Sequence, residues 1–322
     1  MSRFTQSIPR FYNKVNLYPG GMEMSTKQAE LLLITVIALR STSLLFSKIA
    51  LATMGPLTLL GLRFLLAFVI LAAIFFKRLT AMRLVTLGRG LALGGLFFAT
   101  MVCELLGLQY TSSGTTAFLE NTAILLVPLF DALLRRVWPN RSALVSGALA
   151  LTGIAFLTVQ GGRLALGRGE LLCLLAALFY AATIVATDRL AKRDDAVILG
   201  VLQVGCIGVL GTAAAFVFEQ PALPSAAAEW GSVIFLALIC TVLGFTMQPV
   251  AQKYTSTEKA GLYCALNPLI AAVLGCIFLH EDFGLRSFIG AALILSGIAA
   301  SSLLGRGISS SSAQGQPTAG NC

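Results

Sequence analysis

Four ionisable side chains of this sequence lie inside long apolar segments, where charges are rare. They are Arg40, Arg63, Glu104 and Glu120. A charge at the centre of a membrane-spanning helix costs about 2.5 to 3.5 kcal/mol on insertion scales, so such residues normally face a partner or a water-filled cavity. Because the two positive and two negative groups balance, we expect them to serve a shared polar interior that carries the mechanism of the protein.

Arg40 is the candidate ligand for an anionic group of a substrate. Its guanidinium presents a planar fork of donors that matches a carboxylate or a phosphate. The alternative is an arginine that packs between helices and pairs with Glu104 or Glu120. The sequence leaves both interpretations open.

Arg63, Glu104 and Glu120 fall at a similar depth if their apolar segments are helices. At 1.5 Å per residue, each lies roughly 10 Å from one end of its helix. The three groups then form one charged layer, in which we expect Arg63 to pair with Glu104 or Glu120. That layer is either a structural ion pair or a gate or proton-coupling site, because a buried glutamate can hold a proton near neutral pH.

The composition places these residues in a membrane protein. Hydrophobic residues make up 57% of the chain and charged residues only 11%, whereas about a quarter of the residues of a soluble domain are charged. The net charge of +9 comes from basic residues scattered between apolar segments, which does not fit a nucleic-acid-binding surface. A single histidine, His280, and dispersed cysteines without a C-x-x-C pair argue against a metal site, a cofactor or an enzyme active site.

Apolar segments of spanning length alternate with short polar breaks from Leu31 onward. A helix needs about 20 residues to cross roughly 30 Å of hydrocarbon. We therefore predict an all-α integral membrane protein with ten transmembrane helices. The expected ranges are 31–53, 56–76, 90–109, 113–134, 142–160, 170–187, 196–217, 230–251, 258–279 and 286–304.

The second half of the chain repeats the first. The segment from Tyr254 to Glu281, YTSTEKAGLYCALNPLIAAVLGCIFLHE, resembles the segment from Tyr110 to Arg136, YTSSGTTAFLENTAILLVPLFDALLRR. Each begins with Tyr-Thr-Ser and carries a proline inside an apolar run. Five helices per repeat is an odd number, so the second repeat must be inserted upside down relative to the first. Inverted repeats of this kind are a design of secondary transporters.

The repeat aligns the charged residues with uncharged counterparts. The aligned pairs are Arg40 with Tyr180, Arg63 with Gln203 and Glu104 with Gln248. We expect Tyr180 to share substrate binding with Arg40. The two amides are expected to replace the gate or coupling charges in the second repeat, which makes the two ends of the pathway chemically unequal.

Asn121, Tyr263 and Asn267 are further candidates for lining a substrate cavity. Asn267 precedes Pro268, and a proline frees the backbone carbonyl four residues earlier, which in lipid needs a partner or water. The alternative is that this proline only kinks its helix.

The basic residues outside the predicted helices set the orientation. Lys and Arg are far more frequent on the side that holds the N-terminus, and the positive-inside rule makes that side cytoplasmic. We expect both termini in the cytoplasm and a location in the plasma membrane, with Met1, Met22 and Met24 as alternative starts. The expected parts are a cytoplasmic arm at 1–29, a first repeat at 31–160, a second repeat at 170–304 and a disordered cytoplasmic tail at 305–322.

The order and spacing of these features resemble the EamA family of the drug/metabolite transporter superfamily. The resemblance rests on Arg63 in the second predicted helix, the two Tyr-Thr-Ser turns, Asn267-Pro268, and Leu279-His280-Glu281 before a glycine-rich last helix. It covers about residues 31–305. It implies a ten-helix carrier, often an exporter of amino acids or other small metabolites, with a central cavity shared by both repeats.

One position departs from the family pattern. Glu281 stands where the family commonly has an acidic residue in each repeat, but the first repeat has Arg135, Arg136 and Val137 there. A paired role for two such glutamates is therefore absent.

The resemblance favours a transporter of small polar metabolites that works by alternating access, with amino acids or related compounds as the leading substrates. A nucleotide-sugar or other phosphorylated-metabolite carrier is the alternative, although it would need more basic groups in the cavity than Arg40 with Arg63 already paired. A non-transporting channel or scaffold is a second alternative. The expected partners are a small-molecule substrate and the lipid bilayer. Small residues in the last helix of each repeat leave a homodimer open.

Overall fold

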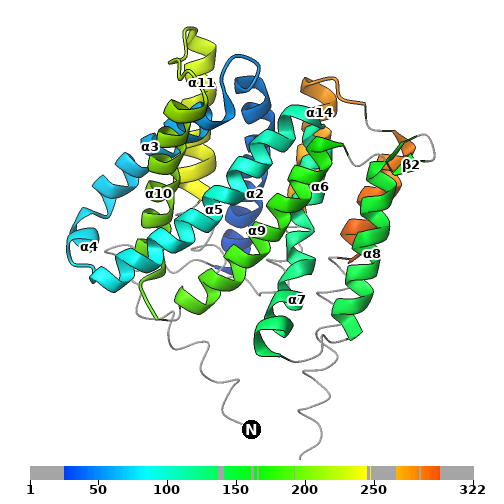
Figure 1. Ribbon diagram of the computed structural model, residues 1–322, viewed down its shortest axis with the longest axis horizontal. Helices are drawn as coiled ribbons and strands as arrows, with labels where there is room; N and C mark the ends of the chain where they lie inside the picture. Colours follow the sequence, from blue (N-terminus) through cyan, green and yellow to red (C-terminus); the bar gives the residue numbers. More distant parts are fainter. Residues whose placement is uncertain are drawn as a thin grey trace, which may run out of the picture.

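The protein is a bundle of long helices (Figure 1), seen in a computed structural model that describes residues 25–136, 141–160, 163–164, 167–191, 193–244, 247, 266–282 and 284–297. Two of the predicted site residues, Tyr263 and Gln248, lie outside the described residues. So do the tail at 305–322, nearly all of the N-terminal arm and the first part of the ninth predicted helix.

The first half of the chain forms helices close to the predicted ranges. They are α2 (Thr26–Ala50), α3 (Pro56–Ile74), the short α4 (Phe76–Thr80), α5 (Leu84–Tyr110), α6 (Ser113–Asn121), α7 (Ala123–Arg135) and α8 (Arg141–Thr158). Pro56 is the first residue of α3, where a backbone N–H would have no hydrogen-bond partner within the helix. Ser25 caps α2 with its hydroxyl on the backbone N–H of Gln28. The N-terminal residues of α2 and α3 thus determine where these two helices begin.

The second half follows the same pattern. It comprises α9 (Arg168–Ala191), α10 (Ala196–Phe218), α11 (Ala227–Phe235), the π-helix η2 (Leu236–Leu243) and α14 (Leu266–Phe278). A further apolar helix covers Leu285–Gly297. Among the residues that the structure describes, five helices, α2, α3, α5, α9 and α10, are long and apolar enough to cross a membrane. The chain is accordingly helical and rich in membrane-spanning segments.

Three local features differ from the predicted helices. The segment predicted as one helix at 113–134 breaks at Thr122, whose hydroxyl donates to the Leu119 carbonyl at 2.6 Å and so competes with the helical backbone. The segment predicted at 230–251 changes from α11 to the wider η2. The predicted all-α fold also contains a two-residue antiparallel ribbon, β1 (Val159–Gln160) with β2 (Arg163–Leu164), which closes the connection between α8 and α9.

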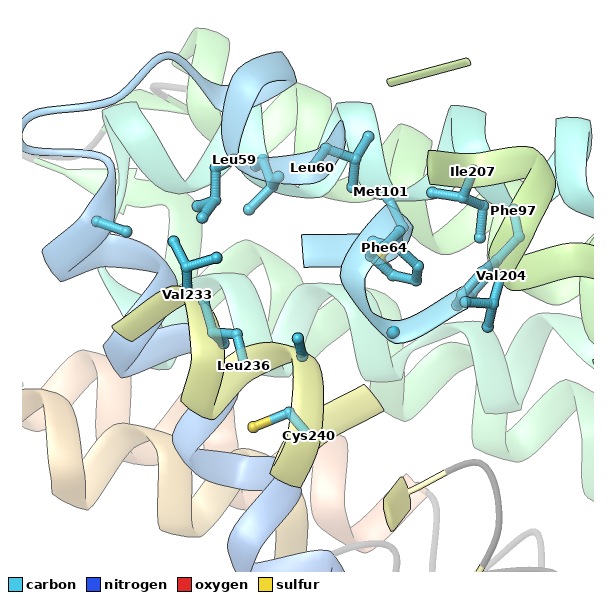
Figure 2. Close-up of a cluster of buried hydrophobic side chains, with 14 of the residues drawn as sticks. Leu59, Leu60, Phe64, Phe97, Met101, Val204, Ile207, Val233, Leu236 and Cys240 are labelled. Carbon is cyan, nitrogen blue, oxygen red and sulfur yellow. The ribbon is translucent and has the colours of Figure 1, made fainter. Parts of the chain in front are cut away.

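Close helix packing depends on small residues, as expected where lipid surrounds the bundle. Helices α3 and α10 cross at Gly61, where an added Cβ would lie 2.7 Å from the backbone nitrogen of Thr212. Helix α5 packs on both α9 and α10, and η2 contacts α2 and α3. The largest apolar cluster joins these helices (Figure 2) through residues such as Leu59, Phe64 and Leu236.

Polar contacts fasten both ends of the bundle. We call the end that holds the α2–α3 connection and the start of α6 the distal end; the α9–α10 turn lies at the opposite, proximal end beside α4 (Figure 1). At the distal end, Lys48 pairs with Glu281 at 2.7 Å. At the proximal end, Asp194 accepts hydrogen bonds from Arg89 and from Thr86. The cavity described below lies between these contacts.

Candidate functional site

A cavity of about 280 Å³ lies within the bundle. Its lining comes from α2, α3, α5, α6, α9, η2 and α14, so segments far apart in the sequence meet there. The polar lining residues are Arg40, Ser41, Ser43, Arg63, Glu104, Glu120, Asn121, Tyr180, Cys240 and Asn267. The apolar lining residues are Ile37, Leu44, Phe64, Phe97 and Met101.

The structure brings together most residues that the sequence singled out. Arg40, Arg63, Glu104 and Glu120 all line the cavity, together with Asn121, Tyr180 and Asn267. Gln203 is different, because it is buried in α10 and is not among the lining residues. The roles assigned to these side chains, as substrate ligands or as a gate or coupling site, remain predictions.

Arg63 is held by a residue that the sequence did not suggest. Its Nε donates to the Thr241 hydroxyl at 3.0 Å, and its guanidinium carbon lies 5.1 Å from the centroid of the Phe64 ring. The expected ion pair with Glu104 or Glu120 is not formed among the described side chains, whose ion pairs of 4 Å or less include Lys48–Glu281, Arg78–Asp195 and Arg89–Asp194. A hydroxyl of the facing η2 segment takes the place of the expected carboxylate.

The four cavity charges nevertheless act on one another. Glu104 interacts electrostatically with both Arg63 and Arg40, and Glu120 interacts with Glu104 and Arg40. In a buried site these interactions are stronger than in water because the surroundings screen them less. The cavity wall thus carries two basic and two acidic side chains close enough to influence one another.

Two amides complete the polar wall. The Ser41 hydroxyl lies 2.7 Å from Oδ1 of Asn267, which ties α2 to the start of α14. The side-chain nitrogen of Asn121 donates to the Ala117 carbonyl of its own helix at 2.7 Å. This bond fixes the orientation of the Asn121 amide at the cavity.

Several lining residues escaped the sequence analysis. Ile37, Ser41 and Leu44 share the face of α2 that carries Arg40, so a helical stripe at intervals of three and four residues could have identified them. Cys240 of the lining and its neighbour Thr241, which lies outside the lining, gave no comparable signal. Their placement depends on the π-helical turn of η2, which the apolar sequence of that segment does not reveal.

Above the cavity, at the distal end, Glu281 joins three parts of the bundle. It accepts a 2.7 Å bond from Lys48 of α2, a 2.9 Å bond from the Ser113 backbone nitrogen at the start of α6, and a 2.7 Å bond from the Ser113 hydroxyl. Lys48 also donates to the Thr111 carbonyl at 2.7 Å. Burial alone would raise the pKa of Glu281, but the bonds from Lys48 and Ser113 outweigh it and lower that pKa below its ordinary value. We call this group the distal clasp.

The chemistry available in the cavity is that of binding. Two guanidinium and two carboxyl groups with two amides can hold a small molecule that carries both an anionic and a cationic group, while the apolar wall accommodates a hydrocarbon part. Within the described part of the chain, no three His, Cys, Asp or Glu side chains are grouped so as to hold a metal ion.

Comparison with known proteins finds similarity to transporters along both halves of the chain. The model of the EamA-like transporter family matches residues 27–159 and again residues 167–303. The uncharacterized transporter YetK of Bacillus subtilis is 23% identical over 307 residues, which cover 90% of this chain and 91% of YetK. An uncharacterized transporter of Archaeoglobus fulgidus is 26% identical over 250 residues, or 77% of each chain.

Two further proteins resemble this chain, one in sequence and one in structure. A protein of Streptantibioticus cattleyicolor named as a probable terminal-alkyne amino-acid exporter is 26% identical over 206 residues, which cover 60% of this chain and 65% of that protein. A solved crystal structure superimposes with a TM-score of 0.62 at 21% sequence identity, covering 86% of this chain and 98% of the other. At that identity the likeness concerns the fold alone.

Proposed function

We propose that this chain, which belongs to the EamA-like transporter family, exports amino acids or related small polar metabolites by alternating access around its cavity. Family membership makes it a multi-pass membrane transporter and not an enzyme. This agrees with the function that the sequence predicted. The substrate class and the transport mechanism are the parts that we propose.

The observation that carries the proposal is the wall of the cavity. Arg40 and Arg63 suit a carboxylate, while Glu104 and Glu120 suit an ammonium group. An α-amino acid carries both groups on the same carbon atom. A relative named as a probable amino-acid exporter supports the same class.

The size of the cavity favours amino acids over nucleotide sugars. Its volume of about 280 Å³ is at the small end of ligand pockets, which span roughly 300 to 1,000 Å³. A nucleotide sugar is several times larger than an amino acid and brings two phosphates. Two acidic groups in the wall would repel those phosphates, so phosphorylated metabolites remain the weaker alternative.

We further propose that two inverted repeats support alternating access, with α2, α3, α5 and α6–α7 corresponding to α9, α10, α11–η2 and α14. The helix contacts support this correspondence. If each helix is replaced by its counterpart in the other repeat, the contact of α5 with α9 becomes the contact of η2 with α2. In the same way, the contact of α5 with α10 becomes the contact of η2 with α3. The contact of α14 with α2 likewise becomes that of α6 with α9. Such a structure can exchange the shapes of its two halves.

The placement in the membrane follows the same proposal. The proximal end carries basic residues such as Arg78, Arg89 and Arg193, and an excess of positive charge marks the cytoplasmic side. We therefore propose that the proximal end faces the cytoplasm of a cell whose plasma membrane holds the protein. The distal clasp would then close the outer end of the pathway.

The proposal is tested by flux in proteoliposomes with a panel of labelled amino acids and nucleotide sugars. We expect saturable flux of amino acids, which Arg40→Ala reduces at least tenfold. Arg168→Ala is the matched control, because Arg168 is exposed at the start of α9 and does not line the cavity. Saturable flux of nucleotide sugars alone would contradict the substrate class, and equal flux in both variants would contradict the role of Arg40.

The same assay tests the proposed coupling role of the two glutamates. If Glu104 or Glu120 carries a proton during transport, an imposed pH gradient drives amino-acid accumulation in the wild type. Glu104→Gln or Glu120→Gln should abolish that accumulation, while exchange at equal pH is weakened by the loss of an ammonium partner but stays measurable at saturating substrate. Accumulation that survives both substitutions would remove these residues from the coupling mechanism.

A further inference from the structure

The η2 segment differs from the other walls of the cavity in its backbone geometry. It is a π-helix from Leu236 to Leu243 that continues the α-helix α11. The Thr241 hydroxyl lies 3.0 Å from the carbonyl of Leu236, five residues earlier, as the wider turn allows. Segments of π-helix are rare and frequently occur at functional sites.

Thr241 faces Arg63 from within this turn. Thr241 is completely buried, and its hydroxyl oxygen lies 3.0 Å from Nε of Arg63. A guanidinium can only donate, so the hydroxyl oxygen must accept from Arg63 and give its own proton to the Leu236 carbonyl. This sequence of donors and acceptors fixes the direction of both hydrogen bonds.

The bond between Arg63 and Thr241 occupies Nε, so the two terminal nitrogens of the guanidinium are the groups that can bind a substrate. Nε is bound to Thr241, while the terminal nitrogens belong to a side chain that lines the cavity beside Glu104. A guanidinium binds a carboxylate best through two parallel N–H groups in a fixed plane. The Phe64 ring, 5.1 Å from the guanidinium carbon, supports the same group from another side.

We propose that Thr241 is a positioning residue for transport, whose hydroxyl, presented by the π-helical turn, holds the Arg63 guanidinium in the orientation that binds the substrate carboxylate. This inference rests on the proposed amino-acid transport and adds a residue outside the cavity lining. It also gives the π-helical turn a function. An α-helical turn would present a different residue at the position of Thr241.

The test compares Thr241→Val, which removes the acceptor at nearly constant volume, with Thr241→Ser, which keeps it. In the amino-acid flux assay, we expect Thr241→Val to raise the apparent KM about tenfold, equivalent to about 1.4 kcal/mol, with maximal flux within about twofold. Thr241→Ser should restore the KM to within about twofold. Thr183→Val is the matched control, since Thr183 is a buried threonine whose hydroxyl bonds its own helix at Phe179.

A double-mutant cycle separates positioning from a general packing effect. In an Arg63→Gln background, Thr241→Val should change the KM by less than about twofold, because the side chain that it positions is gone. A tenfold effect that persists without Arg63 would overturn the inference, as would a wild-type KM in Thr241→Val. Loss of folded protein without a change in KM would assign Thr241 a structural role only. A wild type inactive with every amino acid would contradict the proposed function itself, a result distinct from any of these.

Discussion

Replacing Glu281 with glutamine should loosen the distal end of the bundle. Every group that contacts its carboxylate is a donor: Lys48 Nζ, the Ser113 backbone nitrogen and the Ser113 hydroxyl. A glutamine keeps the shape but turns one acceptor oxygen into an NH₂ group. The NH₂ group then either faces a donor or makes the Ser113 hydroxyl reverse and accept, and the bond that this hydroxyl gave to the carboxylate is lost in both cases.

The structure sets the size of the effect. Hydrogen bonds to charged groups contribute about 1.5 to 3 kcal/mol each. The Lys48 side chain is 28% exposed and that of Glu281 11% exposed, so water weakens the Lys48 contribution to about 1 kcal/mol or less. Losing that pair and one bond from Ser113 should lower the free energy of unfolding by about 2 kcal/mol. If the clasp closes one end of the pathway, the same energy shifts the balance between closed and open states by roughly 30-fold.

The pH dependence provides a second, independent signature. Because hydrogen bonds lower the folded-state pKa of Glu281, its stabilising contribution is complete above the unfolded pKa, about 4.3. The contribution disappears as the pH falls through the lower folded-state pKa. Thermal unfolding in detergent should therefore show Glu281→Gln melting several degrees below wild type at pH 7, with the gap closing in acid. Asp282→Asn is the control, because Asp282 is the exposed neighbouring carboxylate. Equal melting of Glu281→Gln and Asp282→Asn at pH 7, or a gap that widens in acid, would refute this reasoning.

Two further predictions concern the proximal end and the helix packing. Asp194→Asn should lower the free energy of unfolding by about 1 kcal/mol at neutral pH, because hydrogen bonds from Arg89 and Thr86 hold the pKa of Asp194 below its usual value. The stability difference between variant and wild type should vanish as the pH falls through that lowered pKa. A stability difference that stays constant in acid would contradict this prediction. Gly61→Val should destabilise the protein by about 3 kcal/mol, because the added Cβ would meet the backbone of Thr212. Gly88→Val is the control, because a Cβ at Gly88 has nothing within 4 Å. Equal melting temperatures of the two variants would contradict the close crossing of α3 and α10.

The sequence predicted most of the helices and most of the polar part of the cavity wall for a physical reason. Hydrocarbon thickness fixes the length of an apolar segment, so the predicted ranges for α3 and α10 fall within two residues of those observed. A charge inside such a segment needs a polar environment, and Arg40, Arg63, Glu104 and Glu120 therefore meet in one cavity. Burial cost alone was sufficient to select these four residues.

The partners of those residues could not be predicted in the same way. Arg63 binds Thr241, a residue 178 positions away in the π-helix η2. Lys48 was not among the predicted site residues, yet it binds Glu281 across 233 positions. A hydrogen bond between distant segments depends on how helices rotate and pack, and hydropathy carries no information about rotation. The prediction that Arg63 pairs with a carboxylate was wrong because a neutral hydroxyl can satisfy the same donor.

Protection of Cys240 by substrate would show directly whether the transported molecule occupies this cavity. Cys240 is buried in the cavity wall, whereas Cys206 is half-buried outside the lining, with its sulfur near the Leu91 carbonyl. Alkylation of each thiol by N-ethylmaleimide can be followed by mass spectrometry of the peptides while amino acids are titrated in. We expect a transported amino acid to slow alkylation of Cys240 at concentrations matching its transport KM and to leave Cys206 unaffected. Saturable transport with unchanged alkylation of Cys240 would place the substrate path outside this cavity.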